Sequence, residues 1–336
     1  MLNDIPPDQI HVSLAKRLAR GVLHGTGGMS LLRHRNRGRF RILMYHRFRS
    51  GVTEQLHRQL AAFRRHYQVL SLGEIADILD RNKPLPPKTL AITVDDGYRD
   101  FLENAFPAFE SLGVPATVYL VTDFLDRRCW LWTDRVACAL QQTQRASLDL
   151  AIGARSLRFE LRDVAARSSA ARTIIEAAKR LPNAEREALV ERLPGLLEVQ
   201  LDAEPPAALQ ALRWDEVRSM ARQGIEFGAH TRTHPILSRI EENGRLCAEI
   251  EDSRRRIADE LGSPVLHFCY PNGGPTDFTD AVVECVEHSG FRTATTTTPG
   301  MNTADAPRFR LKRYGMEPES PLDYALERAE GLHDRV

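Results

Sequence analysis

Residues 90–98 read Leu-Ala-Ile-Thr-Val-Asp-Asp-Gly-Tyr, a strand-like run that ends in two adjacent carboxylates. The run 90–94 is apolar apart from one threonine, which is typical of a strand buried on both faces of a parallel sheet. Asp95 and Asp96 follow at its end, where two buried carboxylates cannot both ionise freely unless a cation relieves the conflict. A solvated Asp-Asp-Gly turn is the ordinary alternative. The long apolar strand before the pair favours a functional site.

Similar strand-like runs alternate with helical patterns along most of the chain. Strands are expected at residues 41–45, 68–70, 116–121, 225–229, 265–270 and 291–297, and helices at residues 53–66, 100–112 and 214–223. This alternation predicts parallel βαβ units with right-handed crossovers. We therefore expect an α/β protein with seven or eight strands, arranged as a barrel or an open sheet.

Residues 135–213 depart from this rhythm. They begin with a hairpin-like stretch that turns near Gly153, and two polar helical patterns follow. We therefore expect a helical insertion on one face of a barrel domain that spans residues 41–336.

Residues 1–40 form a basic arm. Apolar residues recur in it every four positions, with Lys and Arg between them: Ile10, Leu14, Leu18 and Val22. This spacing predicts an amphipathic basic helix over residues 10–23. The helix either packs on the domain with a solvated basic face or contacts anionic lipid heads or a lipid-linked substrate.

Composition narrows the class of protein. The 336 residues include 46 Lys and Arg against 45 Asp and Glu, so a net charge of +1 gives no global field for nucleic acid. No apolar run approaches the ~18 residues of a membrane span, and the N-terminus lacks the pattern of a signal peptide. The five cysteines include no C-x-x-C pair, which suits reduced thiols. We expect a cytoplasmic protein, with peripheral membrane contact through the arm as a further expectation.

Three more polar segments follow predicted strands. His230 and His234, in His-Thr-Arg-Thr-His, can share one metal ion if they lie on one face of a helical turn. Residues 267–274 end in Pro-Asn-Gly-Gly, a turn that can direct backbone N–H groups at an anion. His46 ends the first strand. Because functional residues of (β/α) barrels gather at the carboxyl ends of the strands, we expect all of these segments to form one site.

These segments resemble the motifs of the polysaccharide deacetylases, the NodB-homology family or carbohydrate esterase family four. Thr-Val-Asp-Asp-Gly-Tyr is similar to the Thr-Phe-Asp-Asp-Gly motif, His-Thr-Arg-Thr-His to the metal motif, and Phe-Cys-Tyr-Pro-Asn-Gly to the third motif of the branch found in exopolysaccharide clusters. The resemblance extends from about residue 41 to 313. It implies a distorted, incomplete (β/α) barrel.

The resemblance also implies residue roles. It makes Asp96, His230 and His234 the ligands of a divalent metal, most often zinc, with cobalt, nickel or manganese as alternatives. Asp95 would be the catalytic base that takes a proton from the attacking water. The backbone N–H of Tyr270 would stabilise the oxyanion.

The sequence departs from the family pattern at three points. Cys269 stands where the third motif usually has an arginine, so we expect Arg313 to hold the base, with its side chain on one face of a late strand. The usual tyrosine after the proline is Asn272. The late motif that supplies the general acid has no clear match, which leaves His46 and His267 as candidates.

Together these observations predict a metal-dependent N-deacetylase that hydrolyses the acetamide of an N-acetylated saccharide, with the glycan free or lipid-linked. Pro271, Asn272 and Trp132 are expected to contact the substrate, Trp132 through sugar stacking. One alternative is a hydrolase of another linear or cyclic amide on the same barrel. Another is a non-catalytic glycan-binding module, although a base beside a metal set argues against it.

Overall fold

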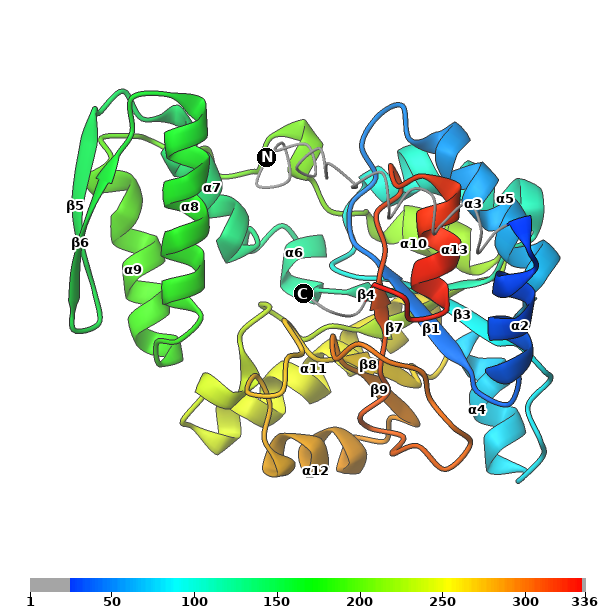
Figure 1. Cartoon of the computed structure of the whole chain (residues 1–336). Coiled ribbons are helices and arrows are strands. Elements are labelled where there is room, and N and C mark those ends of the chain that lie inside the picture. Colours follow the sequence, from blue (N-terminus) through cyan, green and yellow to red (C-terminus); the bar gives the residue numbers. More distant parts are fainter. Residues whose placement is uncertain (1–24, 334–336) are drawn as a thin grey trace.

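The computed structural model describes residues 25–333, so the predicted helix over residues 10–23 lies outside the described part of the chain. An eight-stranded parallel sheet forms its centre, in the order β10-β1-β3-β4-β7-β8-β9 with β2 beside β3. The strands are β1 (Arg41–Tyr45), β2 (Gln68–Val69), β3 (Thr89–Val94), β4 (Ala116–Leu120), β7 (Ile225–Ala229), β8 (His267–Cys269), β9 (Thr293–Thr295) and β10 (Tyr314–Gly315). The sheet curves into a half-barrel, which confirms the predicted fold class (Figure 1).

Helices connect and cover these strands (Figure 1). They are α2 (Gly28–Arg35), α3 (Thr53–His66), α4 (Leu72–Asp80), α5 (Phe106–Leu112), α6 (Thr122–Leu125), α10 (Trp214–Ala221), α11 (Asn243–Leu261), α12 (Asp280–His288) and α13 (Leu322–Ala329), with single turns η1 (Phe101–Ala105), η2 (Ala207–Leu209) and η3 (Leu237–Arg239). Local sequence signals determine where several of these helices begin or end. Ser71 and Glu74 form the capping box that starts α4. Gly113 ends α5 in the left-handed conformation.

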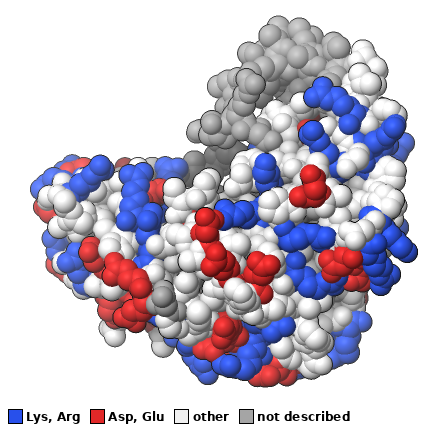
Figure 2. All heavy atoms as spheres, turned by 90° about the horizontal axis from the view of Figure 1, so that it is seen from below, with Lys and Arg blue, Asp and Glu red and all other residues white. Residues whose placement is uncertain are grey.

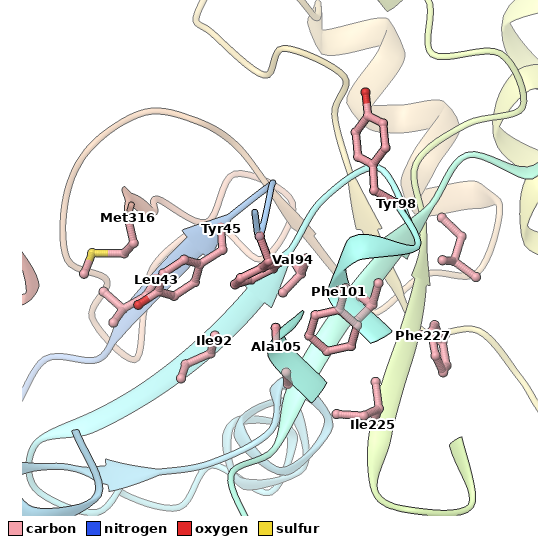
Figure 3. Packing of buried hydrophobic residues seen from close by; sticks show 14 of the residues in the cluster. Leu43, Tyr45, Ile92, Val94, Tyr98, Phe101, Ala105, Ile225, Phe227 and Met316 are labelled. Atoms are coloured by element: carbon pink, nitrogen blue, oxygen red, sulfur yellow. The ribbon is translucent and has the colours of Figure 1, made fainter. Parts of the chain in front are cut away.

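Strand β3 is buried along its whole length, as its apolar run predicts. Leu90, Ile92 and Val94 belong to the main hydrophobic cluster between the sheet and its helices, part of which Figure 3 shows. Ala91 points to the other side, into a smaller inner cluster. Because side chains alternate along a strand, Asp95 continues this inner side. The register therefore directs the first carboxylate of the motif into the half-barrel.

Residues 132–199 hold the predicted hairpin and helices. β5 (Ser147–Ile152) pairs antiparallel with β6 (Arg155–Glu160), and α7 (Trp132–Gln142), α8 (Val164–Ala178) and α9 (Asn183–Leu196) pack around a hydrophobic cluster of their own. We call this unit the insertion; it is green and lies beside the half-barrel in Figure 1.

The late strand begins later than predicted. β10 contains only Tyr314 and Gly315, so Arg313 directly precedes it. The Asn302 side chain accepts from the N–H of Lys312 and donates to its carbonyl, at 2.9 Å each, and so takes the place of a strand partner. The predicted alternation still holds, because Leu311 and Arg313 are buried while Lys312 is exposed.

The described surface agrees with the balanced composition. On the face drawn in Figure 2, basic and acidic side chains are interspersed rather than gathered into fields of one sign. None of the helices in the described part of the chain has the length and apolar character needed to cross a bilayer.

Candidate active site

The four polar segments meet in one cavity of about 240 Å³ at the carboxyl ends of the strands. Sheet register explains this, because Val94 pairs with Tyr45 of β1 and with Val118 of β4, so the residues that follow each strand emerge side by side. The cavity is lined by His46, Asp95, Asp96, His230, His234, Tyr270, Asn272 and Thr297. Thr297 was not predicted, although it follows the short strand β9 just as the other segments follow theirs.

Asp96, His230 and His234 form a compact group suited to a metal ion. Asp96 Oδ1 lies 3.5 Å from His230 Nε2 and 3.4 Å from His234 Nε2. His230 Nδ1 lies 2.7 Å from the Cys269 carbonyl oxygen, so this nitrogen carries the proton and leaves Nε2 as the ligand atom. One carboxylate oxygen and two imidazole nitrogens are a common ligand set for zinc and related divalent ions. These residues therefore fit the divalent metal ion that the sequence predicts.

The backbone of this group is strained. Asp96 has a φ of 75°, and Thr231 and His234 have φ values of 67° and 60°. Such angles are uncommon for residues other than glycine and cluster at functional sites. They also correct the prediction of a helical turn, because the His234 N–H is instead bound by Thr231 Oγ1 at 3.0 Å. A tight turn, not a helix, brings the two imidazoles together.

Gly97 allows the backbone to turn sharply directly after Asp96. Its φ is 78°, and a Cβ there would lie 2.9 Å from Leu120.

Burial alone would raise the pKa of Asp96, but hydrogen bonding to His230 and the nearby imidazole charges hold it well below its usual range. Burial, together with the charge of His230, lowers the pKa of His234 to about 3, so this imidazole is neutral at physiological pH. Burial alone would lower the pKa of His230, but the charges and hydrogen bonds of Cys269, Asp96 and Asp95 raise it, so a metal ion that binds here would displace the proton from its Nε2.

Asp95 is held by Arg313, as the sequence predicts. The guanidinium donates from Nη1 to Oδ1 at 2.7 Å and from Nη2 to Oδ2 at 2.8 Å. It also donates to Thr93 Oγ1 and to the Thr296 carbonyl, so four hydrogen bonds to three residues fix its position. Burial alone would raise the pKa of Asp95, but the charge and hydrogen bonds of Arg313, together with the charges of His46 and His230, outweigh burial and lower that pKa. Asp95 is therefore ionised.

Cys269 lies beside this pair and contacts both of its members. Its Sγ lies 3.1 Å from Arg313 Nη2 and 3.6 Å from Asp95 Oδ2, and its side chain is fully buried. The small thiol leaves room for the guanidinium to arrive from residue 313. This explains how the carboxylate keeps a basic partner although the third motif carries no arginine.

The two histidine candidates for a proton donor lie in different places. His46 Nε2 is 3.5 Å from Asp95 Oδ2, and its side chain is 43% exposed at the mouth of the cavity. His267 does not line the cavity. It lies at the start of β8 with Nδ1 2.8 Å from Thr293 Oγ1, and burial lowers its pKa to about 4. Only His46 of these two is placed to act in the site.

The backbone of Tyr270 does not suit its predicted role. Its N–H already donates to the Thr295 carbonyl at 3.2 Å. Its ring stacks on Phe278 with the ring centres 4.2 Å apart. The next N–H along the chain is that of Asn272, because Pro271 has none. Asn272 lines the cavity with a φ of 58°, and within the described residues neither its backbone N–H nor its buried Nδ2 has a hydrogen-bond partner. The structure favours Asn272 as the oxyanion donor.

Two other predicted substrate contacts lie outside this cavity. Pro271 is buried and shapes the turn, with its carbonyl accepting from the Gly273 N–H at 2.7 Å. Trp132 begins α7 in the insertion, is 6% exposed, and lines a different cavity.

Comparison with known proteins agrees with this site. The family model for polysaccharide deacetylases matches residues 82–294. The chain belongs to the polysaccharide deacetylase family. Members of this family hydrolyse carbon–nitrogen bonds other than peptide bonds, and they generally depend on a metal ion.

Individual relatives match over part of the chain or in fold. The poly-beta-1,6-N-acetyl-D-glucosamine N-deacetylase of Escherichia coli (strain K12) is 36% identical over 81 residues, which cover 24% of this chain and 12% of that protein. The match therefore spans only a small part of this curated relative. The Streptococcus pyogenes deacetylase PplD, solved with acetate, has 17% identity and a TM-score of 0.57, with 87% of this chain and 99% of that chain covered. IcaB from Ammonifex degensii has 15% identity and a TM-score of 0.55, with 88% of this chain and 97% of that chain covered. The solved structures show a shared fold.

Proposed function

We propose that this chain is a metal-dependent N-deacetylase of N-acetylated saccharides, which releases acetate and leaves a free amine on the sugar. The observation that carries the proposal is that an ionised, arginine-held carboxylate, Asp95, shares one cavity with a metal-ligand set. A volume of about 240 Å³ is below the ~300–1,000 Å³ typical of pockets for drug-sized ligands, and suits one acetamide group with the edge of its ring.

The proposed ligands are Asp96, His230 and His234, and zinc is the ion that this set favours, with cobalt, nickel or manganese as alternatives. When bound, a divalent ion supplies Lewis acidity that polarises the acetamide carbonyl and makes water a stronger acid.

Residues around the proposed metal position carry out the other steps of the reaction. Asp95 is ionised and takes the proton of the attacking water, while Arg313 keeps its two oxygens oriented. The backbone N–H of Asn272 donates to the carbonyl oxygen as negative charge develops on it. His46, partly exposed at the mouth, gives a proton to the departing amine. The carbon–nitrogen bond then breaks to yield acetate and the amino sugar.

The substrate class follows from the family and from the curated relative that acts on poly-β-1,6-N-acetylglucosamine. We propose an N-acetylglucosamine polymer or oligomer. The cytoplasmic location, and peripheral membrane contact through residues 10–23, remain predictions from the sequence.

Acetate release tests the proposal directly. The wild type should release acetate from β-1,6-linked N-acetylglucosamine oligomers, and Asp95→Asn should not. Small linear and cyclic amides serve as the competing substrates. Release from those amides alone, with none from the oligomers, would assign a different amidohydrolase activity to the same cavity.

A further inference from the structure

The buried face of α11 contains a carboxylate. Leu246, Ile250 and Ile257 recur on this face at helical spacing and belong to the main hydrophobic cluster. Glu249 lies on the same face and is only 4% exposed. Because glutamate is rarely buried to this extent unless its charge is paired or hydrogen-bonded, its partners indicate what it does.

Both oxygens of Glu249 bind the metal-binding turn, by which we mean residues 230–234. Oε2 accepts from the N–H groups of Arg232 and Thr233 at 2.9 Å each, and Oε1 accepts from Thr233 Oγ1 at 2.6 Å. Successive N–H groups that converge on one oxygen form an anion-binding concavity, and hydrogen bonds to a carboxylate are stronger than those between neutral groups. One buried side chain therefore fixes the middle of the turn.

The carbonyl groups of the turn are bound separately. The N–H groups of Thr122 and Asp123, at the start of α6, donate to the carbonyls of Thr231 and Arg232 at 3.2 and 2.9 Å. Among the described residues, the two N–H groups that Glu249 binds have no other acceptor. Glu249 is therefore the part of the frame that holds these N–H groups.

The turn matters most for the second histidine. His230 is fixed twice, because its N–H donates to the Leu120 carbonyl at 2.9 Å and its Nδ1 lies 2.7 Å from the Cys269 carbonyl oxygen. His234 Nδ1 is buried and has no hydrogen-bond partner in the described part of the chain. Metal-binding histidines are usually oriented by a partner on their second ring nitrogen. The position of the His234 imidazole therefore depends on the backbone of the turn.

That backbone is strained on both sides of the contact with Glu249. Thr231 and His234 have φ values of 67° and 60°, and the two N–H groups that Glu249 binds lie between them. Residues other than glycine keep such angles only where the surrounding structure enforces them. The three hydrogen bonds to Glu249 provide that enforcement.

We infer that Glu249 is a positioning residue of the metal site, which holds the turn so that His234 Nε2 stays beside Asp96. This inference rests on the proposed function for the identity of the metal ligands. Loss of the carboxylate should leave every ligand in the chain but weaken the binding of the metal ion, because the second imidazole is no longer held in place.

Variants of matched shape test this role. Glu249→Gln keeps the length of the side chain but replaces one acceptor oxygen by an NH2 group, which cannot accept a hydrogen bond. Glu251→Gln is the matched control, because Glu251 lies on the same helix and is exposed. Thr233→Val removes the hydroxyl that donates to Oε1, and Thr233→Ser keeps a hydroxyl there. Thr233 is only partly buried, so we expect this second pair to fold even if Glu249→Gln does not.

Metal-free proteins are titrated with zinc against a chromophoric chelator. Glu249→Gln should raise the Kd for zinc about 10–100-fold, equivalent to about 1.4–2.7 kcal/mol, which is the range for residues that orient metal ligands. Thr233→Val should raise the Kd by a smaller factor, while Thr233→Ser and Glu251→Gln should bind like the wild type. In the double variant Glu249→Gln with Thr233→Val the two factors should not multiply, because both substitutions disturb the same contact.

Urea unfolding of the same metal-free proteins separates positioning from a purely structural role. A lower urea midpoint for Glu249→Gln with an unchanged Kd for zinc would overturn the inference. If Glu249→Gln does not fold, equal zinc binding by Thr233→Val and the wild type would overturn it instead.

Zinc binding also separates this inference from the proposed function. Weaker binding by Glu249→Gln supports the positioning role even if the wild type releases no acetate from oligomers. Unchanged binding by this variant, in a wild type that binds zinc and releases acetate, would refute the positioning role and leave the deacetylase intact. A wild type that does not bind zinc would overturn both.

Discussion

The contact between Arg313 and Asp95 gives the most quantitative prediction. Arg313→Met keeps a long apolar side chain but removes both hydrogen bonds to a carboxylate that is 1% exposed. Removing one partner of a buried ion pair costs about 3–5 kcal/mol, because the remaining charge is left without compensation. Because the uncompensated charge disfavours the ionised form, the same substitution raises the pKa of Asp95.

The sign of the pH dependence follows from these directions. In the wild type the pKa of Asp95 is lowered in the folded state, so the pair stabilises the fold above the unfolded pKa. That stabilisation is lost as the pH falls through the folded pKa. In Arg313→Met the folded pKa of Asp95 is raised instead, so the loss of stability is largest at neutral pH and shrinks in acid. The acidic limb of the kcat/KM profile moves to higher pH in the same variant.

Urea unfolding at pH 7, and at the lowest pH at which both proteins fold, measures the first effect, and a pH profile of acetate release measures the second. Lys312→Met is the matched control, because this neighbour is exposed and should change the unfolding free energy by no more than about 0.5 kcal/mol. Arg313→Lys should recover only part of the loss, since lysine has a charge but no planar fork. A loss of stability that does not vary with pH, together with an unshifted acidic limb, would refute a role for Arg313 in keeping Asp95 ionised.

Three further predictions concern the site and the packing of the strands beneath it. Asp95→Asn should keep its bound metal, measured by elemental analysis, and lose kcat by about 10²–10⁴-fold, the range for a general base; a loss of metal would contradict that role. His46→Gln should lower kcat by a similar factor but leave the urea midpoint unchanged, because the side chain is 43% exposed; wild-type kcat would remove it as the proton donor. Gly228→Ala should lower stability by about 1–3 kcal/mol, since a Cβ there would lie 2.6 Å from the Tyr119 ring, whereas Gly244→Ala, with nothing within 4 Å, should be neutral or slightly stabilising; equal midpoints for the two would show that β4 and β7 are less tightly packed.

Much of the fold could be predicted because local patterns and tertiary packing agree. The apolar run before Asp95 indicates a fully buried strand, and the structure buries all of it. Polar segments at strand ends converge because parallel strands share one edge, a rule that needs no knowledge of side-chain contacts. The alternation around Leu311 and Arg313 identified the partner of Asp95 even though the segment is not a strand.

Other features depend on contacts that a sequence pattern does not contain. The spacing of His230 and His234 fits a helix, but the side chain of Thr231 closes a tight turn instead. The N–H of Tyr270 is taken by a neighbouring strand, and which N–H of a turn stays unpaired depends on that pairing. Trp132 was expected to contact the substrate, but the insertion places it in a cavity separate from the one that holds the metal ligands.

Metal dependence of acetate release tests the central claim most directly. Wild-type protein and His230→Ala are treated exhaustively with a chelator, and acetate release from N-acetylglucosamine oligomers is measured before treatment and after zinc is added back. We expect the wild type to lose its activity with its metal and to regain both near one equivalent of zinc, while His230→Ala neither binds zinc tightly nor releases acetate. Unchanged acetate release by the metal-free wild type would contradict the account.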